Sequence, residues 1–169
     1  MLPERPEYHH GISLEVLGQM EYQENTNLST SRLSDGVLER TLKIGRWHVE
    51  FYFATDGYDT DVLLDRLFDF GAGASVMRRA LELMDEGKGN TGFTFSNPYD
   101  KVAIVAIGPT SSGEEFINTL THEVHHLAVA IASELGIDLE SETPAYLAGD
   151  SAMALAEVVC EFGCRHCRS

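Results

Sequence analysis

The chain has 169 residues, of which 43% are hydrophobic, enough for one globular domain whose core needs no disulfide crosslinks. It carries 12 Lys and Arg against 27 Asp and Glu, and the net charge of -15 repels nucleic acid and anionic membranes. The N-terminal residues lack the pattern of a secretory signal, and the longest apolar run, residues 102–107, is too short to span a bilayer. We therefore expect a soluble protein of the cytoplasm that binds neither nucleic acid nor membrane.

The N-terminal part of the chain divides into a polar arm and a β-hairpin. Residues 1–36 end in a run rich in Asn, Ser, Asp and Gly, and we expect them to form an arm that is only partly ordered. Strand-forming residues then alternate over 37–44 and over 47–54, with Gly45-Arg46 between them as a two-residue turn. This pattern predicts a hairpin at the start of the folded domain.

Two short helices and a second pair of strands follow the hairpin. Apolar residues recur at helical spacing over 59–69 and over 74–86. Strand formers then return over 91–95 and over 101–107. The mixture predicts an α+β fold, in which a small antiparallel sheet packs with helices in one domain of residues 37–169.

The longest predicted helix covers residues 113–135 and has clear signals at both ends. Ser112 and Glu115 fit a capping box at its start, and Gly136 is typical of the position just after a helix end. Apolar residues inside it recur every three or four positions and form one stripe, which we expect to face the core. They are Phe116, Leu120, Val124, Leu127, Ile131 and Leu135. A second helix is predicted over about 143–162.

The long helix contains the pattern H-E-x-x-H at residues 122–126. His122 and His126 lie on one side of the helix, about 200–240° around the axis from the apolar stripe, so both imidazoles can converge on one ion. Glu123 lies beside them as the candidate general base, whereas we expect His125 to be a surface residue or to support the ligands. The alternative is a solvent-exposed histidine face that holds no metal.

Two motifs in this part of the chain resemble a known family. H-E-x-x-H at 122–126 is followed by E-x-x-A-Y-L at 142–147, which resembles the zincin-type metallopeptidases with a downstream glutamate ligand, the gluzincins. The combination is also similar to proteins of bacteriophages and mobile elements that carry both motifs. The metzincin pattern is excluded, because it requires Gly and His where this chain has Val129 and Ala132.

This resemblance implies a zincin-like domain that binds one Zn²⁺ through His122, His126 and Glu142. It also implies an edge strand before the active-site helix, which we place at residues 101–107, along which an extended peptide could pair. The implied activity is hydrolysis of a peptide bond in a peptide or protein substrate. Glu123 would take a proton from a water molecule that the zinc ion activates.

The identity of the third ligand depends on the path of the chain after the long helix. We expect residues 137–141 to form an extended return that carries Glu142 to the level of His126. If the two helices instead form a direct antiparallel hairpin, Asp150 lies nearer the histidines. Tyr146 either donates a hydrogen bond to a reaction intermediate or packs at the interface between the helices.

A non-enzymatic function is the alternative to hydrolysis. The net charge of -15 also suits a phage or mobile-element binding protein, in which an acidic surface on a zincin-like scaffold occupies a basic partner. Cys160, Cys164 and Cys167 lie together at the C-terminus beside His166. Because no second ligand pair accompanies them, we expect reduced thiols there rather than a second zinc site.

Overall fold

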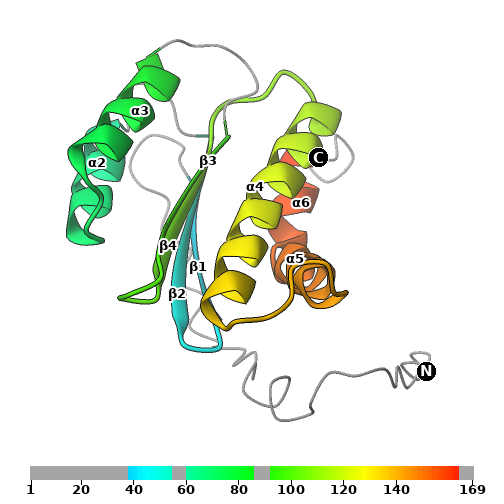
Figure 1. Cartoon of the computed structure of the whole chain (residues 1–169). Helices are drawn as coiled ribbons and strands as arrows, with labels where there is room; N and C mark the ends of the chain where they lie inside the picture. The colour runs from blue at the N-terminus through cyan, green and yellow to red at the C-terminus, as the bar shows by residue number, and fades with distance from the viewer. Residues whose placement is uncertain (1–37, 55–59, 86–91, 164–169) are drawn as a thin grey trace.

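The computed structural model describes residues 38–54, 60–85 and 92–163 (Figure 1). The predicted N-terminal arm and the last two cysteines lie outside these residues. In chain order the elements are β1 (Leu38–Ile44), β2 (Trp47–Phe53), α2 (Thr60–Asp69), α3 (Ala74–Asp85), β3 (Gly92–Asn97), β4 (Val102–Ile107), α4 (Gly113–Glu134), α5 (Thr143–Ala154) and α6 (Ala156–Gly163). The α+β class is confirmed. None of the described helices is long and apolar enough to cross a membrane.

The sheet has four strands in the order β1-β2-β4-β3, and it is mixed rather than antiparallel as predicted. β1 and β2 form the expected antiparallel hairpin, and β3 and β4 form a second antiparallel pair. β2 and β4, however, run parallel. The physical reason is the connection between the two pairs. α2 and α3 carry the chain past the place of β4 to the sheet edge, where β3 runs opposite to β2, and the chain then turns back into β4 beside β2.

The predicted edge strand at residues 101–107 is also wrong. β4 lies between β2 and β3, and β3 is the edge strand on the side of β4, as β1 is on the side of β2. The sequence of β4, VAIVAI, is apolar at every position, and all of its residues after Val102 are buried. A strand that is covered on both faces requires such a continuous apolar run, whereas the edge strand β3 alternates apolar residues with small and polar ones.

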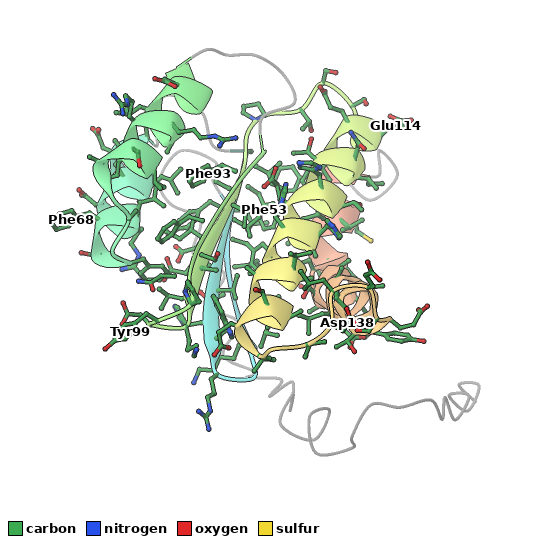
Figure 2. The ribbon with its side chains drawn as sticks, in the orientation of Figure 1. Phe53, Phe68, Phe93, Tyr99, Glu114 and Asp138 are labelled. Carbon is green, nitrogen blue, oxygen red and sulfur yellow. The ribbon has the colours of Figure 1, made fainter. Side chains whose placement is uncertain are left out.

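Helices cover both faces of the sheet (Figure 1). α2 and α3 pack on one face, and α4, α5 and α6 pack on the other. Figure 2 shows Phe53 on the α4 side of the sheet and Phe93 on the side of α2 and α3. Alternate residues of β4 contribute to the two cores, Val105 to the core under α4 and Ile104 to the core under α2 and α3. The sheet is therefore the middle layer of three.

Helix α4 begins and ends where its sequence predicts. The Ser112 side chain accepts a hydrogen bond from the Glu115 backbone N–H at 3.2 Å. The Glu115 carboxylate accepts hydrogen bonds from the side chain and backbone of Ser111, which lower its pKa below the ordinary value. At the other end, Gly136 has φ +66°, and the N–H of Ile137 donates to the Ala132 carbonyl at 2.9 Å. This is a Schellman motif, in which glycine takes the left-handed position.

The second helix predicted over 143–162 is divided into α5 and α6 at Leu155. The Leu155 N–H contacts two carbonyls, those of Ser151 and Ala152, each at 3.2 Å. Leu155 itself and Val158 are buried in the core beneath α4. The interruption therefore coincides with the point where the chain anchors apolar side chains in that core.

Candidate metal site

His122 and His126 point to one place on the exposed surface of α4. Their Nε2 atoms lie 3.1 Å apart, and their ring centroids are 4.6 Å apart with an interplanar angle of 86°. Two nitrogen ligands of a tetrahedral zinc ion lie about 3.3 Å apart, given the ~2.0–2.1 Å length of the zinc–nitrogen bond. The pair thus has a separation close to that of two ligands of one ion, and both side chains are exposed to solvent.

Within the described part of the chain, no third ligand is grouped with this pair. Among the residues that the structure describes, no three His, Cys, Asp or Glu side chains are grouped so that they could hold a metal. Glu142 is exposed at the N-cap of α5, where its side chain makes no capping hydrogen bond. Asp150 lies further along α5 and is partly buried. The assignment of Glu142 as third ligand therefore stays a prediction.

The chain between α4 and α5 forms a tight turn. The Ser141 N–H donates to the Asp138 carbonyl at 3.1 Å, and the Asp138 carboxylate accepts from the Glu140 N–H at 3.0 Å. The extended return predicted for residues 137–141 is therefore wrong, because the side chain of Asp138 bonds the backbone two residues on and closes a turn. α5 then runs across α4 (Figure 1), so the direct antiparallel hairpin is not formed either.

Glu123 faces the sheet rather than solvent. Its side chain is buried between α4 and β3, in contrast to the exposed histidines beside it in the sequence. The Thr94 hydroxyl on β3 donates to the Glu123 carboxylate Oε2 at 2.6 Å and lies 3.1 Å from the Glu123 carbonyl oxygen. The carboxylate is therefore held by the edge strand and not by its own helix.

Thr94 and Gly92, two residues of β3 that the H-E-x-x-H pattern does not include, lie against the Glu123 side chain. In β3 the residues Phe93 and Phe95 pack toward α2 and α3. Because side chains alternate along a strand, Gly92, Thr94 and Ser96 face α4. The alternation of small residues with phenylalanines in β3 favours this contact, because a helix can approach a strand closely over a face of small residues.

The other side chains considered for the site lie near the surface. His125 is exposed, and its ring centroid lies 6.3 Å from that of His126, as expected for a residue beside the pair. Tyr146 is 46% exposed, so it does not form the packed aromatic that we considered for the helix interface. Cys160 is an exposed free thiol.

A second polar cluster lies on the opposite face of the sheet, at the contact between β2 and α2. The Glu50 carboxylate is buried and receives two hydrogen bonds from the Arg66 guanidinium, one of them from Nε at 3.0 Å. Tyr52 donates to it at 2.7 Å, and His48 lies 3.1 Å from it. Burial alone would raise the pKa of Glu50, but the hydrogen bonds from Arg66, Tyr52 and His48 bring it below the ordinary value.

Comparison with known proteins does not identify a family. No family model, no curated protein and no solved structure matches this chain. The resemblance to gluzincins therefore depends on the two motifs at 122–126 and 142–147 alone.

Proposed function

We propose that this protein is a zinc-dependent peptide-bond hydrolase of the zincin type. His122 and His126 bind the ion through Nε2, and Glu123 is the general base. Glu142 is the third ligand that the gluzincin resemblance implies, and it must move toward the histidines when the ion binds, because it is not grouped with them in the structure. The observation that carries this proposal is the 3.1 Å separation of the two Nε2 atoms on the exposed side of α4. The same distance also fits a hydrogen bond between the two imidazoles, which is the metal-free alternative that metal analysis must exclude.

The proposed chemistry divides the work between the ion and the side chains. A bound zinc ion supplies a Lewis acid and lowers the pKa of water toward ~7. The Glu123 carboxylate accepts the proton of the attacking water and transfers it to the leaving amide nitrogen. Its burial against β3 excludes bulk water from this carboxylate, which strengthens its interaction with a nearby positive charge.

The edge strand β3 supports a peptide as the substrate. Among the described strands β3 pairs with β4 alone, so its second edge has no strand partner there. An extended peptide can add to such an edge through backbone hydrogen bonds. α4 packs against β3 through the Thr94–Glu123 contact, which keeps this strand next to the helix that carries the histidines.

Metal analysis of the purified protein tests the site. We expect about one equivalent of zinc per chain, because two convergent imidazoles and a carboxylate make a three-ligand site with one open position. Replacing His122 and His126 together by alanine should abolish this binding. His125→Ala is the matched control, since it removes an exposed histidine from the same turn. Equal zinc content in all three proteins would refute the site.

Position 123 then separates an enzyme from a zinc-binding protein without activity. Glu123→Gln should retain zinc and lose hydrolysis of a library of quenched fluorescent peptides, because glutamine cannot accept the proton. If zinc-loaded Glu123→Gln hydrolyses the peptides as fast as the zinc-loaded wild type, Glu123 is not the base. The second candidate function, an acidic binding protein, is favoured by the net charge of -15 and predicts no hydrolysis by the wild type.

A further inference from the structure

The Thr94 hydroxyl holds the Glu123 side chain between α4 and β3. Thr94 Oγ1 lies 2.6 Å from Glu123 Oε2 and 3.1 Å from the Glu123 carbonyl oxygen. A hydroxyl has one proton to donate, and a hydrogen bond to an ionised oxygen is shorter and stronger than one to a neutral carbonyl. The Thr94 hydroxyl therefore donates its hydrogen bond to the carboxylate oxygen Oε2. This bond fixes the orientation of the Glu123 side chain.

Gly92 provides the space that this orientation needs. A Cβ at position 92 would lie 2.5 Å from both Cγ and Oε1 of Glu123, and 2.7 Å from Cδ. Gly92 does not have positive φ, so glycine is required there by the close approach of Glu123 and not by backbone conformation. The carboxylate thus lies directly over the backbone of the edge strand, with Oε2 on the Thr94 hydroxyl and Oε1 over Gly92.

We propose that Thr94 and Gly92 are positioning residues for Glu123. Thr94 holds Oε2 by its hydrogen bond, and Gly92 allows the carboxylate to occupy this place. The expected effect of Thr94 and Gly92 on kcat rests on the proposed function. The position of the Glu123 carboxylate, however, can be measured without turnover. General bases act efficiently only when their own orientation is fixed by neighbouring groups.

A purely structural contact between α4 and β3 is the competing explanation, and kinetics distinguish the two. Thr94→Val replaces the hydroxyl by a methyl group of similar shape. We expect this variant to retain zinc and KM while kcat falls about 10–100-fold, the usual effect of losing a supporting hydrogen bond. Thr94→Ser should restore kcat because it restores the hydroxyl. If the contact is purely structural, Thr94→Val should lower the free energy of unfolding but should not lower kcat at unchanged KM.

Ser96→Ala is the matched control. It removes a hydroxyl from the same strand and the same face, two residues beyond Thr94, and should leave kcat unchanged. Gly92→Ala is a second, independent variant that displaces the carboxylate while leaving Thr94 in place. It should reduce kcat to a similar extent, so the proposal can be tested even if Thr94→Val fails to fold.

Carbon-13 NMR of protein labelled at the glutamate carboxyl carbons gives a readout that does not need activity. The Glu123 signal is the one that disappears in Glu123→Gln. We expect it to shift in Thr94→Val and Gly92→Ala, and to keep its place in Thr94→Ser and Ser96→Ala. An unshifted signal in Thr94→Val and Gly92→Ala would overturn the inference, as would a shifted signal accompanied by normal kcat in both. If the zinc-loaded wild type hydrolyses no peptide, the proposed function fails and the NMR shifts alone decide whether Thr94 and Gly92 position the carboxylate.

Discussion

His122, Glu123 and His126 belong to one turn of helix but have different surroundings. The two histidines are exposed and converge through their Nε2 atoms, whereas Glu123 is buried against the edge strand. At about 100° per residue, Glu123 is rotated by about 100° from His122 and by about 60° from His126, so it can face another part of the molecule. In this protein that part is β3, where Thr94 supplies a hydrogen bond.

The third ligand is the residue whose assignment is easiest to refute. Glu142 is exposed and makes no capping hydrogen bond, so no cap interaction holds its side chain in place. We expect Glu142→Gln to weaken zinc affinity by at least the ~10–100-fold typical of losing a supporting contact, and Asp150→Asn to have a smaller effect. Glu140→Gln is the control, because it removes an exposed carboxylate from the same connection. Calorimetric zinc titration measures all three, and a larger effect at Asp150 would reverse the assignment.

At the level of elements, the buried carboxylate of Glu50 joins β2 to α2. Arg66 contacts two carboxylates, the buried Glu50 and the exposed Asp69 at 3.3 Å. The two-point contact of a guanidinium with a buried carboxylate is a strong pairing, whereas an exposed pair contributes about 0–1 kcal/mol. The Arg66 side chain is 36% exposed, which places the first pair below the ~3–5 kcal/mol of a fully buried one.

We therefore expect Glu50→Gln to reduce the free energy of unfolding by about 1–3 kcal/mol at pH 7, and the control Asp69→Asn to change it by less than ~1 kcal/mol. Because the pKa of Glu50 is lowered in the folded state, its contribution is fully present above its ordinary value of 4.5 and is lost as the pH falls through the lowered value. Urea unfolding from pH 7 down to pH 3 measures this. The difference between wild type and Glu50→Gln should shrink toward acid pH, and a constant difference would show that Glu50 is not ionised in its pair.

At the level of the whole molecule, the fold has two hydrophobic cores, one on each face of the sheet, and a large excess of negative charge. The net charge of -15 destabilises the compact state through repulsion among acidic side chains, and salt screens this repulsion. We expect the free energy of unfolding to rise between about 0.01 M and 0.3 M NaCl, as the screening length falls from ~30 Å to below ~10 Å. Sodium chloride is used rather than sulfate, because sulfate also strengthens hydrophobic burial. A decrease in stability with NaCl would mean that favourable ion pairs outweigh the repulsion.

Features that depend on near neighbours in the chain could be read from the sequence. The hairpin of β1 and β2, the Ser112 cap, the Gly136 helix end and the four-residue spacing of His122 and His126 all appear where predicted. Turns, caps and helix faces are determined by groups at most a few residues apart, so their signals lie within a short stretch of sequence.

Features that join distant segments were decided only by the tertiary structure. The parallel pairing of β2 with β4, the position of β3 at the edge and the Thr94–Glu123 contact each connect residues far apart in the chain. The turn at Asp138 is local, but the requirement that Glu142 reach the histidines favours an extended segment there, and the turn was therefore not predicted. Strand order and side-chain contacts across layers depend on which faces must be buried together, and a pattern within one segment cannot specify its partner. The sequence therefore determined which residues could form the site, and the packing of α4 on β3 determined how Glu123 is held within it.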